Sequence, residues 1–402
     1  MIDATGKAAS PFAAVFRRGT KPASPRSPAG LPARKLLTMP SCRRGFTPRS
    51  WTLEEKSVFE SGHKAPPTAR SLPVTGKKCF AVDDGSIRLH PGLHRILSVL
   101  VLITAFALPQ LPAAETSEPA PLAARALLLD AVNTGDKIVA VGDHGIIVLS
   151  RDNGLTWTQS ITPTRALLTA VSFPDAHHGW AVGHDGIILA TNDSGLTWQR
   201  QDDRKSLDAV FLDVRFLDLN QGFAVGAYGK FLTTSDGGKT WTPRKPATEE
   251  VHYNRLTVGA DNSLYLAGES GTLLLSPDSG KTWHKSEVPY DGSLFGTLAL
   301  ANGDLLVYGL RGHIFRSDDH GATWAPKNSE LKVLITSGLR LKNGTIVLGG
   351  QGGNFFVSHD DGHTFTAWKS ADFGTSIAGM VEANDGAIVT VGEAGAVRVK
   401  LP

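Results

Sequence analysis

An eight-residue motif recurs six times along the chain and constrains its fold more than any other feature. The motif reads Ser/Thr-x-Asp-x-Gly-x-Thr-Trp/Phe, and its aspartates are Asp152, Asp193, Asp236, Asp278, Asp319 and Asp360. Successive aspartates lie 41, 43, 42, 41 and 41 residues apart. A fixed period of this length predicts an array of similar units, because each unit buries its apolar surface only against its neighbours.

A second motif, in which a glycine follows a short apolar run, precedes each copy and occurs a seventh time near the C-terminus. Its glycines are Gly142, Gly183, Gly226, Gly268, Gly309, Gly350 and Gly392. Each unit contains four runs rich in β-branched and aromatic residues, as in 166–173, 179–183, 186–191 and 197–201. Such runs predict strands, and about 40–45 residues with four strands make one propeller blade. We therefore predict an all-β, seven-bladed β-propeller of four-stranded antiparallel blades over residues 115–402.

The side chains of the eight-residue motif suit a structural role. The aspartate can accept hydrogen bonds from nearby turn amides, and the glycine permits a positive φ. The aromatic residue offers a large apolar face to a neighbouring blade, at Trp157, Trp198, Trp241, Trp283 and Trp324. Six equivalent aspartates around a ring are typical of a fold signature, and their spacing differs from a calcium loop. We therefore predict neither metal sites nor catalytic residues among them.

The seventh unit ends at Pro402 without its own eight-residue motif or fourth strand. An uncovered sheet edge favours aggregation, so another segment is expected to cover it. We predict that residues 115–125 supply the missing outer strand and close the ring. Pro119 and Pro121 are tolerated there because an outermost strand has one unpaired side.

The N-terminal part has a different character. Residues 96–108 are thirteen uncharged, mostly apolar residues that follow His94 and Arg95. This pattern predicts a signal peptide over 91–114, with an uncleaved membrane anchor as the alternative. Residues 1–90, rich in Arg, Ser and Pro, are expected to be a disordered extension or part of an over-long gene model. A bipartite targeting sequence is the other possibility.

Charge and cysteine content limit the compartment and the partners. Residues 1–114 hold 17 Lys and Arg against 6 Asp and Glu, whereas residues 115–402 hold 24 against 32. An acidic body repels phosphate backbones, so we predict no nucleic-acid partner. Cys42 and Cys79 both precede the propeller, which suits an oxidising compartment. We expect a periplasmic or otherwise extracytoplasmic monomer without a cofactor.

Basic and aromatic residues gather in the loops that join the fourth strand of one blade to the first strand of the next. These residues are typical interface anchors, and loops on a rigid scaffold commonly carry function. We predict a protein-binding surface around blades one to four at Arg165, Arg200, Arg204, Lys205, Arg244, Lys245, Tyr253 and Arg255. A solvated rim is the alternative, because acidic residues are interleaved with these positions.

Two other functional classes remain open from the residues alone. The turns between second and third strands carry carboxylates from four blades, and two of these could converge as in a glycosidase: Asp143, Asp185, Glu269 and Glu393. A glycan- or lipid-binding module is a third possibility. His144 and His184 occupy neighbouring turns, whereas His177 and His178 are expected at the other end of their blade, so a shared metal site is disfavoured.

The repeats match the Asp-box, or bacterial neuraminidase repeat, signature over about residues 126–400. A single seven-bladed ring behind a signal peptide resembles the photosystem II stability/assembly factor family. The resemblance implies an exported, non-catalytic propeller that binds a protein, such as a subunit of a membrane complex. Plant members of that family reside in the thylakoid lumen and bind the precursor reaction-centre subunit. The photosynthetic members carry an arginine-rich patch in a middle blade, and this sequence departs from them because it has no such cluster; Arg311 and Arg316 come closest to one.

Overall fold

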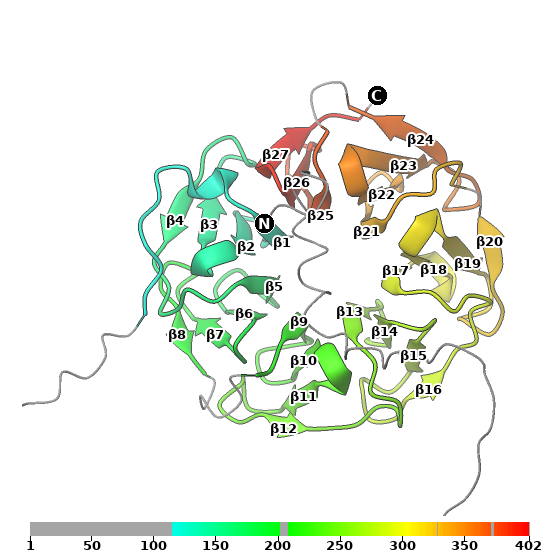
Figure 1. The fold of residues 1–402 in the computed structure, drawn as a ribbon, viewed down its shortest axis with the longest axis horizontal. Coiled ribbons are helices and arrows are strands. Elements are labelled where there is room, and N and C mark those ends of the chain that lie inside the picture. The colour runs from blue at the N-terminus through cyan, green and yellow to red at the C-terminus, as the bar shows by residue number, and fades with distance from the viewer. Residues whose placement is uncertain (1–114, 202–207, 328, 371–373, 402) are drawn as a thin grey trace, which may run out of the picture. The chain divides into compact units, whose positions relative to one another are not determined.

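The computed structural model describes residues 115–201, 208–327, 329–370 and 374–401. Their strands form seven antiparallel sheets set side by side around a ring, as Figure 1 shows. Six sheets have four strands and the seventh has three, so the predicted seven-bladed propeller is confirmed. The helical elements of the described residues are 3-10 turns: η1 (Ala123–Arg125), η2 (Asp143–Gly145), η3 (Ala227–Gly229), η4 (Ala301–Gly303), η5 (Leu310–Gly312) and η6 (Gln351–Gly353). Within that same part of the chain, no helix has the length and apolar character needed to cross a membrane.

Blades one to four follow one another along the chain without exchanging strands. Blade one contains β1 (Leu128–Asn133), β2 (Ile138–Gly142), β3 (Ile147–Ser150) and β4 (Thr158–Ser160). Blade two contains β5 (Leu168–Ser172), β6 (Gly179–Gly183), β7 (Ile188–Thr191) and β8 (Gln199–Arg200). Blade three contains β9 (Phe211–Phe216), β10 (Gly222–Gly226), β11 (Phe231–Thr234) and β12 (Thr242–Pro243). Blade four contains β13 (Tyr253–Val258), β14 (Leu264–Gly268), β15 (Leu273–Ser276) and β16 (His284–Lys285).

Blades five to seven complete the ring in the same way. Blade five contains β17 (Leu294–Ala299), β18 (Leu305–Gly309), β19 (Ile314–Ser317) and β20 (Ala325–Lys327). Blade six contains β21 (Ile335–Arg340), β22 (Ile346–Gly350), β23 (Asn354–Ser358) and β24 (Thr366–Lys369). Blade seven contains β25 (Ile377–Glu382), β26 (Ile388–Gly392) and β27 (Gly395–Val399). The first strand of every blade is innermost, as Figure 1 shows.

The second strand of each blade is buried along its whole length. Blades pack face to face, so both faces of such a strand meet apolar neighbours. This is why these strands read as continuous apolar runs such as IVAVG and LYLAG rather than as alternating patterns. Each run ends in the glycine of the second sequence motif. Gly142 has an extended φ of −174°, and a Cβ there would overlap the carbonyl oxygen of Leu127. The close approach of the segments around Gly142 and Leu127 therefore requires glycine at this position.

The Asp-box aromatic residues connect consecutive blades. Trp198 of blade two lies in one buried cluster with Val139 and Leu149 of blade one. Trp324 of blade five likewise packs with residues of blade four, including Leu275. Trp157 of blade one contacts the cluster that contains Val389 of blade seven. The aromatic residue thus faces the preceding blade, which links the repeats into one ring.

Residues 115–125 do not provide the predicted fourth strand of blade seven, and that prediction was wrong. The segment lies along blade one instead, where the Ser117 amide donates to the Thr162 carbonyl at 2.9 Å. Gln159 Nε2 also donates to the Glu118 carbonyl at 2.9 Å. Blade one contacts this segment through isolated main-chain and side-chain hydrogen bonds, which suits a segment interrupted by two prolines better than a regular ladder does. Among the described residues, blade seven keeps three strands.

The ring closes through side chains of blades one and seven rather than through a shared sheet. Asn133 Nδ2 donates to the Glu382 carbonyl at 2.8 Å, and the Asn384 amide donates to Asn153 Oδ1 at 3.1 Å. Arg398 of β27 donates to the main-chain carbonyl of Asn153 in the Asp box of blade one. Closure therefore uses residues beside the turns between first and second strands and in the Asp box of blade one.

The predictions for residues 1–90 and 91–114 lie outside the described residues, as do Arg204 and Lys205 of the predicted interface.

Candidate functional site

The propeller presents two different faces. The turns between second and third strands contact the loops that connect consecutive blades, as in the hydrogen bonds from Gly186 to Ala209 and from Gly229 to Val251. We call this side the loop face. The Asp boxes lie with the turns between first and second strands, as in the hydrogen bond from Ser194 to His177. The loop face is therefore opposite the Asp boxes, as the sequence predicted.

Each Asp-box aspartate holds its own turn. Asp152 accepts hydrogen bonds from the Thr156 hydroxyl at 2.5 Å, the Thr156 amide at 2.8 Å and the Ser150 hydroxyl at 2.8 Å. These contacts, led by the threonine hydroxyl, lower the pKa of Asp152 to about 2. Asp236 and Asp319 behave in the same way, with pKa values of about 2. All the partners belong to the same turn, so these carboxylates act on the fold rather than on a ligand.

Four residues of the predicted interface lie in or beside the outer strands and loops. Arg165 is exposed and pairs with Glu118 at 2.7 Å, and Arg200 is half-buried in β8. Arg244 and Lys245 follow β12 and are exposed, and Lys245 pairs with Glu250 at 3.3 Å. The structure therefore brings Arg244 and Lys245 together and leaves Arg165 in a separate contact on blade one.

Tyr253 and Arg255 do not lie in a loop, contrary to the sequence reading. Both belong to β13, the innermost strand of blade four. Tyr253 is 1% exposed and packs in the core of blades three and four. Arg255 points toward the centre of the ring. The strand begins earlier than expected because its apolar residues pair with β14, and this pairing removes both side chains from the loop face.

A groove of about 820 Å³ lies beside the outer strand of blade three, between blades two and three. Apolar and aromatic side chains contribute to its lining, among them Ile188, Phe211 and Trp241. Its charged lining residues are four cations and two carboxylates: Lys230, Lys239, Arg244, Lys245, Glu249 and Glu250. The groove thus combines an apolar surface with an excess of positive charge, which suits an extended acidic segment of another protein.

Tyr228 also lines this groove. It is 53% exposed and has a φ of 54° in the turn between β10 and β11. Its ring meets His252 edge-on at a centroid distance of 4.7 Å. A bulky residue in left-handed geometry is uncommon, and here it places an aromatic ring at the surface. Sequence reasoning missed Lys230 and Lys239 because they lie in turns within blade three rather than in the loops between blades.

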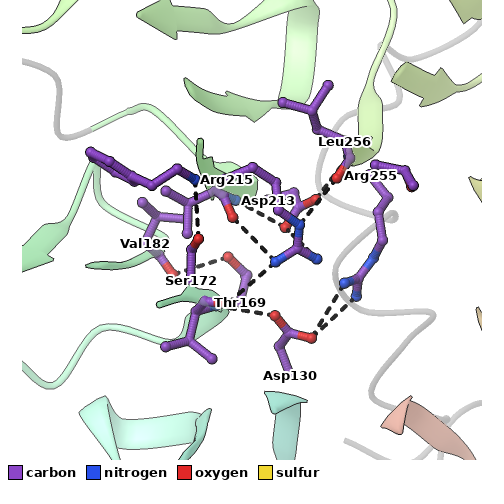
Figure 2. A network of polar contacts seen from close by, with 12 residues as sticks. Asp130, Thr169, Ser172, Val182, Asp213, Arg215, Arg255 and Leu256 are labelled. Atoms are coloured by element: carbon purple, nitrogen blue, oxygen red, sulfur yellow. Dashed lines mark hydrogen bonds and ion pairs between the residues drawn. The ribbon is translucent and has the colours of Figure 1, made fainter. Parts of the chain in front are cut away.

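A buried polar network near the centre of the ring was not predicted at all. Figure 2 shows Arg255 of blade four reaching Asp130 of blade one, with Nη1 and Oδ1 3.3 Å apart. Asp213 of blade three accepts a hydrogen bond from the Leu256 amide at 2.8 Å. Arg215, on the same strand, donates to the carbonyls of Leu256 at 3.1 Å and Val171 at 3.3 Å. The four charged groups therefore connect blades one to four.

Burial and charge act in opposite directions in this network. Burial raises the pKa of Asp213, and the neighbouring Arg215 and Arg255 only partly offset that effect. Burial alone would lower the pKa of Arg255, but Asp130 and Asp213 outweigh it and raise the pKa. Both arginines are paired, so the network functions as an internal connection. The sequence signal was the charged residues inside three of the first strands, LLDAVN, FLDVRF and YNRLTV.

The carboxylates of the glycosidase alternative lie on the loop face, and three of the four contact residues of their own blades. Asp143 lies 3.0 Å from His144, and Glu269 lies 3.5 Å from His252. Glu393 accepts from the Ser376 amide at 3.2 Å. His177 and His178 lie on the Asp-box face, where His178 meets Asp175 at 2.9 Å. Across the described ranges, no cluster of three or more His, Cys, Asp or Glu side chains could hold a metal ion.

Comparison with protein families gives one match, to the family described as photosynthesis system II assembly factor YCF48. The matched residues are 149–206 and 203–401. No curated protein matches the sequence. The matched regions begin in the first Asp box and extend through all later blades, so the match covers most of the propeller.

Solved structures with similar folds include two YCF48 propellers. One, described as YCF48 bound to D1 peptide, is 19% identical with a TM-score of 0.59, covering 74% of this chain and all of that chain. YCF48 from Cyanidioschyzon merolae is 16% identical with a TM-score of 0.56, covering 70% and 98%. The WD40 β-propeller domain of Doa1 is 14% identical with a TM-score of 0.56, covering 71% and 95%. At these identities the likeness concerns the fold alone.

Proposed function

Because the chain belongs to the photosynthesis system II assembly factor YCF48 family, we propose that it is a non-catalytic propeller that binds a subunit of a membrane complex during assembly. The groove between blades two and three is the observation that carries this proposal. It offers an apolar surface and four cations on a rigid scaffold. A YCF48 structure with a bound D1 peptide supports the idea that such a ring binds a protein segment.

The proposed partner segment is extended, apolar and acidic. Trp241 and Leu232 would contact its apolar side chains, and Arg244 and Lys245 would attract its carboxylates. Lys245 already pairs with Glu250, so an incoming carboxylate would compete with that exposed pair at little cost. These contacts would supply the affinity for the segment and fix its orientation in the groove. Binding of this kind involves no chemical reaction.

The proposal includes export, on the strength of the apolar run 96–108 and the cysteine-free propeller. In this view the protein works in the periplasm, or in the thylakoid lumen of a photosynthetic organism. The family assignment favours a non-enzymatic role.

The test is a crosslinking pull-down from the native membrane fraction with the full chain carrying Arg244→Glu and Lys245→Glu. The wild-type protein should capture an integral membrane subunit, and the double variant should lose that capture. A matched control carries Lys327→Glu and Lys332→Glu, the same change of charge after the outer strand of blade five. Thermal unfolding of all three proteins establishes that the ring is intact. Equal capture by the groove variant would contradict the proposal.

A further inference from the structure

The outer edge of blade seven differs from those of the other six blades. Their outermost strands contain two to four residues, and β12 and β20 include proline. In blade seven the outermost strand of the described residues is β27, with five residues and the sequence GAVRV. Proteins protect exposed edges by shortness, proline or charge. β27 therefore has the longest and least protected outer edge in the described part of the ring.

The main-chain groups along this edge can be assigned from one contact. The Thr390 hydroxyl of β26 donates to the Val397 carbonyl at 3.1 Å, so that carbonyl faces β26. Main-chain groups alternate in direction along a strand, so the amides and carbonyls of Ala396 and Arg398 face outward. No hydrogen bond between described residues reaches these outward groups. They form a row of donors and acceptors suited to another strand.

The charged side chain of Arg398 does not protect the strand edge from pairing with another strand. It donates to the Asn153 carbonyl and to Asp385 Oδ2, the latter at 2.9 Å, and thus contributes to ring closure. The edge is instead bordered by apolar surface on both sides. Ala396 and Trp157 of blade one pack against one buried cluster, and Val397 and Trp368 of blade six pack against another. A strand placed here would bury alternate side chains against those two blades.

We infer that β27 binds an extended segment of a partner protein as the fourth strand of blade seven. The inference deepens the proposed protein-binding function and rests on it, but it uses a surface separate from the groove. Lys369 at the end of β24 and Lys400 after β27 are both exposed. The segment should therefore alternate apolar residues and carry an acidic residue beside these lysines.

The described residues that precede β1 do not occupy this edge. The described chain enters along β4 of blade one, where Ser117 contacts Thr162. It reaches blade seven only at η1, which lies over Gly395 at the start of β27. The main chain that leads into the propeller therefore passes beside the open edge without pairing with it. A second copy of the protein is the remaining occupant, and the experiment separates it.

The binding probe is a labelled synthetic peptide with the sequence of residues 358–369, SHDDGHTFTAWK, which includes the fourth strand of blade six. Binding to the full chain is measured by fluorescence anisotropy, and hydrogen exchange reports on the amides of β27. We expect the amides of Ala396 and Arg398 to become protected. Ala396→Pro removes one outward amide and should weaken binding about tenfold, whereas Ala396→Ser should leave it unchanged.

A second variant remains informative if Ala396→Pro fails to fold. It extends the chain after Pro402 with a copy of residues 359–369, which supplies an Asp box and a fourth strand. This capped protein should fold and should no longer bind the peptide. Equal binding by the capped and wild-type proteins, or no binding by the wild type, would overturn the inference. So would a wild-type dimer that the cap converts to a monomer, because the occupant would then be a second copy.

The groove variant keeps the two proposals distinct. Arg244→Glu with Lys245→Glu should bind the peptide as the wild type does, because its substitutions lie on blade three. If the groove variant captures the membrane subunit normally while the capped protein loses the peptide, the groove proposal fails and the edge inference stands. The reverse pattern supports the groove alone.

Discussion

Arg255 of blade four pairs with Asp130 of blade one, although blades two and three separate them along the ring. Their charged groups lie 3.3 Å apart, and both side chains are largely buried. Asp130 also accepts from the Val171 amide of blade two at 3.1 Å. One ion pair thus joins residues 125 positions apart in sequence and fixes the innermost strands relative to one another.

Removal of one member of this pair should be far more costly than removal of both. Arg255→Met leaves Asp130 buried without its cation and should lower the free energy of unfolding by about 3–5 kcal/mol. Asp130→Asn combined with Arg255→Met should recover most of that loss, because no unpaired charge remains. Urea unfolding of the single and double variants measures the coupling. Additive losses would show that the pair does not act as a unit.

Lowering the pH should destabilise the folded propeller, because it protonates the Asp-box aspartates. The pKa values of Asp152, Asp236 and Asp319 are about 2, below the ordinary value near 3.9. A lowered folded-state pKa gives stabilisation that is complete above the ordinary pKa and is lost as pH falls toward 2. The denaturant concentration at the unfolding midpoint should therefore decrease as the pH is lowered from about 5 to about 2. Thr156→Val should make the midpoint less dependent on pH, because it removes a hydrogen bond to Asp152. The control Thr248→Val, on an exposed loop, should leave the pH dependence unchanged. An unchanged pH dependence in Thr156→Val would contradict the assignment.

Asp213 should contribute a pH dependence of opposite sign. Burial raises the pKa of this carboxyl in the folded state. A raised folded-state pKa means that stabilisation is present at low pH and is lost as pH rises through the folded value. The Asp213→Asn variant should therefore gain stability relative to the wild type as the pH rises above about 4, as measured by thermal unfolding at each pH. A difference that stays constant, or shifts toward the wild type, would refute this reading.

Replacing a glycine that ends a second strand, even by alanine, should destabilise the folded protein. A Cβ at Gly350 would overlap the Leu334 carbonyl oxygen, whereas a Cβ at Gly374 meets open space. Gly350→Ala should cost about 1–3 kcal/mol or more, because crowding forces the two strands apart. Gly374→Ala should be close to neutral. Urea unfolding compares the two, and equal effects would show that the glycine is not needed for close packing.

Much of the architecture could be predicted because its signals are local. The hydrogen bonds of Asp152 reach no further than four residues along the chain, so the turn is specified by the motif that encodes it. The 41- to 43-residue period then gives the number of blades and the face on which each turn lies. Arg244 and Lys245 were placed correctly on the surface because they follow a short outer strand.

The sequence by itself determined the blades, their number and the turns that connect their strands, since each depends on residues that are close along the chain. Only the tertiary structure decided that Arg255 meets Asp130, that Tyr253 is buried, and that residues 115–125 lie on blade one. These contacts form between blades, where closure of the ring sets the distances. The sequence of a repeat specifies the turns within that repeat, but it does not specify which residues of distant repeats its side chains will contact.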